Sequence, residues 1–481
     1  MRAFVPLSFA LCSFACASSG TGDAGTSPDS GAQDSGTHAD ASAADAGHDD
    51  AMGAPDATEA DAGLDDSGVV TDSGPRVGPV TVVFQPGAPF PGRGTAVFSD
   101  PSGNVLSVRT TSTGTIVANV PEGALLTATP EIFDGTNMNS RVGLVTVAGI
   151  APGETYRVDP WFTVNIRGQM TFNGGTPYPG AASYAFDFGC STYGIPDIAM
   201  DYSLTIPDNC TGTSSTTLTF LASALDINGV RLAYRVQENV PIVIGGRVAL
   251  SGPWSTDFQH VDIHYSNPPA GAQSLLNVVV VTSKQALVDQ ENGQVAMLNV
   301  PAGTVPFQKA RFGDGVSHEF RMQNGLRGES WMIRNTAAFV PSIDLDLTRD
   351  LLAFPSDVNV TSSTASPDRP VLDWTSDPST DFVVVQVVID GFNNEWLVFL
   401  PGGSDHFQLP ALPDVMASLR PTAATSFQGA QRVIESSAIS NYGQARAVFG
   451  QALLGWERGF WAQVIPSGIT VRGAGILLQA D

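Results

Sequence analysis

The sequence predicts an all-β protein in which tandem β-sandwich domains follow a signal peptide and a disordered acidic tether. Short runs rich in Val, Ile, Thr, Phe and Leu recur about every eight to twelve residues, and Pro-Gly, Asp-Gly, Asn-Gly and Gly-Gly turns separate them. Helical periodicity is scarce by comparison. This even spacing of short strands is typical of β-sandwiches. About 405 residues follow residue 76, enough for three or four domains of ordinary size.

The first fifteen residues have the composition of a secretory leader. Arg2 supplies one positive charge, and a largely apolar run extends from Ala3 to Ala15. This run is too short to remain as a membrane-spanning helix, so we expect a signal peptide that is removed on export. No later stretch of the sequence reaches the roughly eighteen uninterrupted apolar residues that a spanning helix needs.

Ser13-Phe14-Ala15-Cys16 resembles a bacterial lipobox, in which the cysteine thiol receives a diacylglyceryl group. Ala15 fits the small residue before the cysteine, whereas Ser13 stands where lipoboxes usually carry Leu. The resemblance implies a lipoprotein signal peptide over residues 1–16, lipidation at Cys16 and attachment to the membrane through acyl chains. It also implies an outer-membrane lipoprotein, on either the surface or the periplasmic face. The alternative is ordinary cleavage near Ala15 or Ala17, which releases a soluble exported protein.

Residues 17–76 repeat Asp-Ala-Gly, Asp-Ser-Gly and Asp-Ala-Ser. Thirteen acidic residues lie from Asp23 to Asp72, with no Lys or Arg among them. Such a segment buries too little apolar surface to offset its ordering entropy, so we expect a disordered tether with a span of roughly 40–45 Å. Calcium binding is an alternative interpretation of so many Asp residues. The carboxylates do not form the alternating Asp-x-Asp-x-Asp-Gly loop that wraps one ion, so we favour the tether.

The charge of the chain excludes one class of partner. The formal net charge is −24, of which the tether contributes −13 and Arg2 contributes +1, leaving −12 for residues 76–481. A body this acidic is repelled by phosphate backbones and anionic surfaces, so we expect no nucleic-acid partner.

Two cysteines remain in the body of the exported chain. Cys190 and Cys210 form a natural pair in an oxidising compartment, and a disulfide that closes this loop of about twenty residues would contribute roughly 3 kcal/mol. No His lies between them to suggest a metal site. The alternative is two separate buried thiols.

Residues 77–160 are predicted to form the first sandwich, with expected strands at Val80–Phe84, Thr95–Phe98, Val105–Thr111, Thr115–Val120, Leu125–Thr129 and Leu144–Ile150. The run "TAVFSDPSGNVLSVRTTSTGTIVANVPEGALLTA" has an Asp-x-x-Gly turn at Asp100–Gly103, a turn at Gly114 and a Val-Pro-x-Gly corner at Val120–Gly123. It resembles the carboxypeptidase regulatory-like, transthyretin-type sandwich. That family is a structural or binding addition and is not itself hydrolytic, which is what the resemblance implies here.

Residues 161–350 are expected to hold one or two further sandwiches, with a second one beginning near Gly252-Pro253-Trp254. Val300-Pro301-Ala302-Gly303 echoes Val120–Gly123, which hints at a repeated module. A hinge over residues 351–370 precedes a last domain at 371–481. Its opening "PVLDWTSDPSTDFVVVQVVIDGFNNEWLVFLP" resembles a fibronectin type III-like sandwich, with Trp374 and Trp396 expected in the core.

Two segments are candidates for helices. Pro413–Leu419 carries Pro at its first turn, and Gln444–Trp456 is compatible with either a helix or a strand.

The sequence contains no recognisable catalytic motif. Gly-x-Ser-x-Gly, His-Glu-x-x-His, Cys-x-x-Cys, Walker and Rossmann patterns are all missing from it, so we expect neither an enzyme nor a bound cofactor. His260-Val261-Asp262-Ile263-His264 is the one constellation that could hold a metal. On a strand, His260, Asp262 and His264 share one face, but the outer two lie about 13 Å apart, so a metal would need ligands from a neighbouring strand. The simpler interpretation is a polar solvent face opposite a packed Val261 and Ile263.

The tryptophans suggest a second class of function, because aromatic faces stack on sugar rings. Most tryptophans are expected in cores, which leaves Trp254, Trp331, Trp456 and Trp461 as candidates for a carbohydrate platform, and Trp456 and Trp461 are the pair we favour. The sequence thus predicts a lipid-anchored cell-envelope protein that acts as a non-catalytic binding, adhesion or structural module with an unidentified protein or glycan ligand. The alternative is a carbohydrate-binding protein or a polysaccharide-acting hydrolase accessory, because paired carboxylates need no local motif. A strand-edge or aromatic surface would favour the binding module, and a cleft with perturbed carboxylates would favour the enzyme.

Overall fold

The computed structural model divides the chain into two compact units, residues 1–73 and Gly74–Asp481. The residues that it describes are 75–84, 86–87, 90–130, 142–158, 166–188, 191–207, 217–283, 286–292, 296–297, 301–311, 315–324, 328–336, 340–363, 366–375, 377, 379–389, 394–451, 453 and 469–476. The predicted signal peptide, Cys16 and the tether lie outside these residues. In the described part the chain is overwhelmingly strand, so the predicted all-β class is confirmed.

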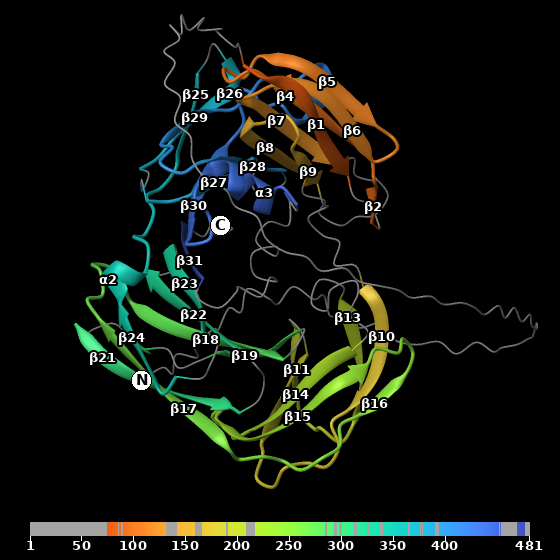
Figure 1. Cartoon of the computed structure of the whole chain (residues 1–481), viewed down its shortest axis with the longest axis vertical. Coiled ribbons are helices and arrows are strands. Elements are labelled where there is room, and N and C mark those ends of the chain that lie inside the picture. The colour runs from red at the N-terminus through yellow and green to blue at the C-terminus, as the bar shows by residue number, and fades with distance from the viewer. Residues whose placement is uncertain are drawn as a thin grey trace, which may run out of the picture. The chain divides into compact units, whose positions relative to one another are not determined.

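The first set of strands builds a sandwich whose two sheets have the orders β6-β1-β9 and β5-β4-β7-β8 (Figure 1). β1 pairs antiparallel with β6 and parallel with β9. The side chains of β1 alternate between the two faces of the β6-β1-β9 sheet. Val80, Val82 and Phe84 are buried, while their neighbours are more exposed. The bounds are β1 Val77–Phe84, β2 Pro86–Gly87, β3 Phe90–Pro91, β4 Gly94–Ser99, β5 Val105–Thr111, β6 Thr115–Pro121, β7 Ala124–Pro130, β8 Val142–Ile150 and β9 Thr155–Val158.

The second set of strands repeats this order. Its sheets are β13-β10-β16, with β10 and β16 parallel, and β12-β11-β14-β15. Aromatic rings dominate its core, with Phe186 packed against Phe172, Phe188 and Phe220. The bounds are β10 Ile166–Asn173, β11 Ser183–Phe188, β12 Ser191–Ile195, β13 Asp201–Pro207, β14 Thr217–Leu225, β15 Arg231–Pro241 and β16 Arg247–Ala249.

The third set has the same order again, with sheets β21-β17-β24 and β19-β18-β22-β23 and with β17 and β24 parallel. The short β20 also pairs with β18. Asp346 caps helix α2 by accepting hydrogen bonds from the backbone of Thr348 and Arg349. The bounds are β17 Phe258–Ser266, β18 Ser274–Ser283, β19 Ala286–Asn292, β20 Ala296–Met297, β21 Ala302–Ala310, β22 Gly315–Asn324, β23 Gly328–Thr336, β24 Ser342–Asp346 and α2 Leu347–Asp350.

The repeat in strand order is real, but the sequence echo does not mark it. Val120–Gly123 lies at the end of β6, the fourth long strand of its set, whereas Ala302 and Gly303 begin β21, the fourth long strand of the third set. Trp254, which was expected to open a second middle sandwich, packs instead on the core of the β10–β16 set.

The fourth set has a different order, with sheets β25-β26-β29 and β28-β27-β30-β31. Leu372, Trp374 and Trp396 are buried in its core, as predicted for both tryptophans. The bounds are β25 Asn359–Ser363, β26 Ser366–Asp373, β27 Phe382–Ile389, β28 Asn394–Pro401, β29 His406–Gln408, the 3₁₀ helix η1 Asp414–Leu419, β30 Phe427–Ser436, α3 Tyr442–Phe449 and β31 Thr470–Ile476.

The two helical candidates both contain helix. The first is a 3₁₀ helix, and residues 444–449 of the second belong to the α-helix α3, whereas residues 452 and 454–456 lie outside the described residues. Asn441 caps α3 by accepting a hydrogen bond from the backbone of Gln444 at 3.0 Å, and the Gln444 side chain accepts one from the backbone of Ser440 at 2.8 Å. Within the described residues, no helix combines the length and the apolar character needed to cross a membrane.

Sheets from three of the four sets join edge to edge. β8 pairs in parallel with β28, and β23 pairs antiparallel with β31, so the described strands form one thirteen-stranded sheet, here called the long sheet. Its path runs β19-β18-β22-β23-β31-β30-β27-β28-β8-β7-β4-β5, with β20 beside β18. Backbone hydrogen bonds therefore connect these sandwiches directly, in addition to the chain segments between them.

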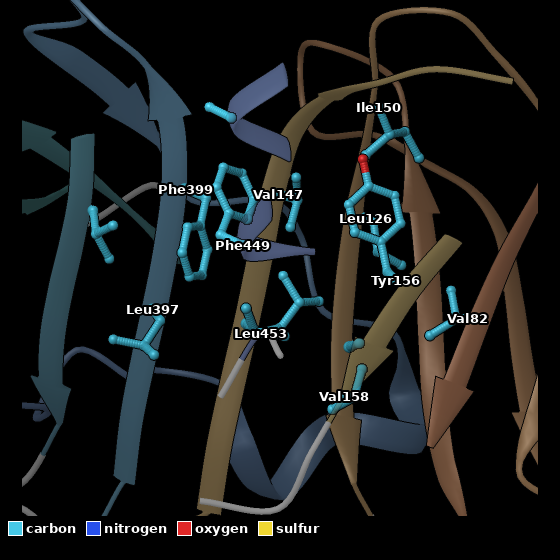
Figure 2. Packing of buried hydrophobic residues seen from close by; sticks show 14 of the residues in the cluster. Val82, Leu126, Val147, Ile150, Tyr156, Val158, Leu397, Phe399, Phe449 and Leu453 are labelled. Carbon is cyan, nitrogen blue, oxygen red and sulfur yellow. The ribbon is translucent and has the colours of Figure 1, made fainter. Parts of the chain in front are cut away.

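Much of the long sheet is buried on both faces. Every residue of β4 and β7 is buried, in contrast to the alternation of β1 and β6. One face packs against β1, β6 and β9 and against α3 in a single core, in which the Phe399 and Phe449 rings stack at 4.5 Å and lie near Val147 (Figure 2). The other face packs against β25, β26 and β29. Burial on both faces removes the need for polar residues at alternate positions.

Polar contacts also connect the first and fourth sets. The Arg446 guanidinium donates to Glu154 from Nε at 2.9 Å and from Nη2 at 2.9 Å, and the Tyr156 hydroxyl donates to the same carboxylate at 2.5 Å. Burial raises the pKa of Tyr156 well above its usual value, so its hydroxyl keeps the donated proton. Trp396 Nε1 donates to the Thr146 hydroxyl at 2.8 Å.

Candidate binding surface at a free sheet edge

The clearest candidate surface is β5, which ends the long sheet. Among the described residues, β5 has a strand partner on one side only, which is β4. Three of its apolar side chains are exposed, with relative exposures of 40% for Val105, 50% for Leu106 and 36% for Val108. An exposed apolar edge strand is a ready template for pairing with another chain, and proteins usually protect such edges. We call these three residues and their strand the β5 edge.

β5 carries two of the usual protections of an edge strand, one charged residue and one β-bulge near its start. It contains no proline and one charged residue, Arg109. A register irregularity opposite Phe98 and Ser99 places an extra residue at the start of the strand, whereas the stretch from Ser107 to Thr111 pairs regularly with β4. The regular stretch therefore carries an ordinary row of outward backbone groups.

The turn before β5 is held firmly. Asp100 accepts hydrogen bonds from the Asn104 backbone at 2.8 Å and from the Asn104 side chain at 2.9 Å, and these bonds hold the pKa of Asp100 below its usual value. Gly103 has φ of +81°, a conformation that favours glycine. The Arg369 guanidinium on β26 donates to the Ser102 carbonyl, so the turn is fixed to a neighbouring sheet. The β5 edge is thus presented from a preorganised hairpin.

The candidate metal ligands lie on the solvent face of β17. His260, Asp262 and His264 are exposed and alternate with Val261 and Ile263, whose side chains are buried, as the simpler interpretation expected. His264 Nδ1 lies 2.9 Å from the Thr304 hydroxyl. In the part of the chain that the structure describes, no three His, Cys, Asp or Glu residues come together where they could hold a metal ion. The strand alternation therefore accounts for the exposure of these three side chains.

The predicted aromatic and cysteine sites are only partly described. Trp456, Trp461, Cys190 and Cys210 lie outside the described residues. Trp331, which the sequence left open as a platform, is buried in the core shared with the first sandwich.

Trp254 is the described tryptophan that stays partly exposed. Its ring lies over the Arg235 guanidinium at 4.5 Å, and its Nε1 donates to the Thr176 carbonyl at 2.9 Å. The Tyr178 and Tyr184 rings lie at 5.8 Å and 6.0 Å from it. Arg235 is itself buried, which lowers its pKa, and its guanidinium donates to backbone carbonyls. The contacts fix the orientation of the indole ring.

Buried charges cross the long sheet away from the β5 edge. Glu319 and Glu395 are almost fully buried, and burial raises the pKa of Glu329. Arg321 contacts Glu319, and the charge of Arg432 acts on Glu329. The Gln386 side chain donates to Glu395, so each of these carboxylates lies near an arginine or an amide. This arrangement neutralises charge inside the sheet and links β22, β23 and β30.

The sequence predicted the position of β5 but not the exposure of its apolar side chains. The signal was the pattern Val-Leu-Ser-Val-Arg-Thr-Thr, in which two adjacent apolar residues break the alternation of a half-buried strand. Read alone, that pattern is equally compatible with a strand buried on both faces.

Comparisons with known proteins show no family. No protein-family model and no curated protein matches the chain. Among solved structures, the FN1–FN3 domains of chicken CNTN1 are 11% identical, with a TM-score of 0.15, and the match covers 65% of this chain and 89% of that chain. A tetra-tandem repeat from the extending region of a large adhesion protein is 11% identical, with a TM-score of 0.12, covering 75% of this chain and 95% of that one.

A leucine-rich repeat protein from Bacteroides thetaiotaomicron is 10% identical with a TM-score of 0.16, covering 37% of this chain. The match spans a quarter of the length of that protein. Identities and TM-scores this low carry no argument about function. The strands of the described residues show a β-sandwich protein.

Proposed function

We propose that this protein is an exported, lipid-anchored component of the cell envelope that acts as a non-catalytic binding module. The single observation that carries the proposal is the β5 edge, which exposes Val105, Leu106 and Val108 at the end of a sheet that is otherwise extensively buried. Strand addition to such an edge uses backbone hydrogen bonds for affinity and alternate side chains for specificity. Cys16 and the acidic segment behind it supply the anchor and the tether in this proposal.

Two measurements test the proposal separately. The first compares membrane fractionation of the wild type with Cys16→Ala in the native host. We expect the wild type to sediment with the outer membrane and the variant to be soluble, and a soluble wild type would refute the anchor.

The second measurement places a photo-cross-linking amino acid at Leu106 on intact cells. The same amino acid at Ile227 is the matched control, because Ile227 is exposed in another sandwich. We expect protein adducts at position 106 alone. Equal adducts at both positions, or none, would refute binding at the β5 edge.

A second candidate function, carbohydrate binding, is supported by the oriented and partly exposed Trp254 ring. An indole face held in place by a cation and a hydrogen bond presents a surface for sugar stacking at little entropic cost. The test is retention on polysaccharide columns of the wild type and of Trp254→Ala, with Ile227→Ala as the control. Retention that is lost in Trp254→Ala alone supports this function, and equal retention of all three proteins removes it.

A further inference from the structure

We propose that the partner strand of the β5 edge is β5 of a second copy of this chain, in an antiparallel pair about a two-fold axis. This inference rests on the proposed function only in using the same surface. Two features of the structure support the inference. The chain already joins its own sheets edge to edge, and β5 carries apolar residues at a free edge.

Edge pairing is how the chain builds its longest sheet. β8 with β28 and β23 with β31 each connect strands from different sandwiches, and both joins lie within one continuous sheet. β5 is the end of that same sheet, so a pair of β5 strands would add a third edge-to-edge join, antiparallel like the one between β23 and β31. A closed dimer needs a two-fold axis, which makes the new strand pair antiparallel.

The residues of β5 complement themselves in this arrangement. Leu106 is the extra residue of the bulge opposite Phe98 and Ser99, so the pairing requires Leu106 to take a regular extended position in the dimer. A pair centred on Ser107 then puts Leu106 opposite Val108 of the partner subunit, and Val108 opposite Leu106 of the partner subunit. Both cross-strand pairs are then apolar, and apolar pairs stabilise antiparallel strands. Val105 comes to lie opposite the aliphatic stem of Arg109 of the partner subunit. The two Arg109 side chains end up about 13 Å apart along the strands, beyond direct repulsion.

Charge predicts how the dimer responds to salt. Each body carries a net charge of −12, so two copies repel each other at long range. Added salt screens that repulsion, whereas the apolar contacts at the β5 edge are insensitive to screening. Dimerisation through this edge is therefore expected to strengthen with ionic strength. A dimer held mainly by ion pairs would show the opposite dependence.

The first test measures the mass of the mature Cys16→Ala chain by sedimentation velocity over a range of concentrations. We expect a weak dimer with a Kd on the order of 10–100 µM, because one strand pair buries less than a standard interface of about 1,600 Å². Leu106→Lys is expected to raise the Kd at least about tenfold, because an edge lysine blocks strand pairing. Ile227→Lys adds the same charge at another exposed site and is expected to leave the Kd unchanged.

The second test fixes the register. Directly opposed residues of an antiparallel pair have Cα atoms about 4.5–5.5 Å apart, within disulfide range. Ser107→Cys is therefore expected to form a covalent dimer under mild oxidation, and Ile227→Cys is not. A wild type that stays monomeric, a dimer that persists in Leu106→Lys, or a Ser107→Cys chain that does not cross-link would each overturn the inference. Adducts of a foreign protein at position 106 on cells, with a monomer in solution, would keep the proposed function and reject the second copy.

Discussion

Phe449→Ala tests whether the first and fourth sandwiches share one core. Phe449 lies on α3, is about 1% exposed, and packs against Phe399 at 4.5 Å and Phe382 at 5.2 Å between ring centroids. The same cluster contains residues of β1, β6 and β9 from the first sandwich. The backbone after α3 is also tied to β9, because Arg157 donates to the Gly450 carbonyl at 2.7 Å and accepts from Leu453 at 2.9 Å. Removal of this ring should therefore loosen strands of both sandwiches.

The expected loss follows from the burial of the side chain. Truncating a buried phenylalanine to alanine costs about 3–5 kcal/mol, which includes the cavity that remains. If the sandwiches open together, hydrogen exchange of their most protected amides rises on the order of 10²–10³-fold, since each 1.4 kcal/mol is about a factor of ten. The effect should extend to β8 and β9, although the substitution lies in the fourth set.

Hydrogen exchange followed by mass spectrometry measures this directly on peptides that cover β9, β27 and β28. Phe186→Ala is the matched control, because Phe186 is equally buried in the separate core of the β10–β16 set. That variant should raise exchange in its own sandwich and leave β9 unchanged. Faster exchange confined to β27 and β28 in Phe449→Ala would refute the shared core.

Three further changes have defined outcomes. Burial raises the pKa of Glu329, so its ionised form opposes folding above that pKa and the penalty disappears as pH falls through it. In thermal scans, Glu329→Gln should therefore have a higher Tm than the wild type at about pH 8 and the same Tm near about pH 4. An equal gain in Tm at both pH values would contradict this. Trp396→Phe removes the hydrogen bond to Thr146 and should lower the urea unfolding free energy by about 1–3 kcal/mol, so an unchanged midpoint would contradict it. Gly103→Ala strains a residue at φ +81° and brings its Cβ within 2.6 Å of Arg369 Nη2. We expect the urea unfolding free energy to fall by about 1–2 kcal/mol, and an unchanged value would contradict the fixed turn.

The sequence predicted those features that depend on local pattern. β5 was expected at Val105–Thr111 and is found there, because turn residues bound it on both sides. The alternation of β17 placed Val261 inside and His260 outside, as its two-residue period requires. Trp374 and Trp396 were expected in the core and are buried. The local sequence therefore determines where these strands form and which of their side chains face the core.

The edge-to-edge joins were not predicted, because no local signal encodes them. β8 and β28 are some 250 residues apart in the chain, and the sequence of neither strand indicates which strand it pairs with. The complete burial of β4 and β7 depends on those joins, since β25, β26 and β29 cover the second face. For the same reason the exposure of Leu106 could not be read from its sequence. An apolar strand looks alike whether it is central or at the edge of a sheet.

The parallel pairing of the first and last strands in three of the four sets has a mechanical consequence. β1 lies beside β9, β10 beside β16, and β17 beside β24, each pair running in the same direction. The start of the first strand and the end of the last therefore lie at opposite ends of the pair. A pull on these two points drives the strands past each other, so the hydrogen bonds between them, which cross the strand direction, are strained together and do not open one at a time. Each of these sandwiches thus resists stretching in shear, the geometry in which a small β-domain bears the most force.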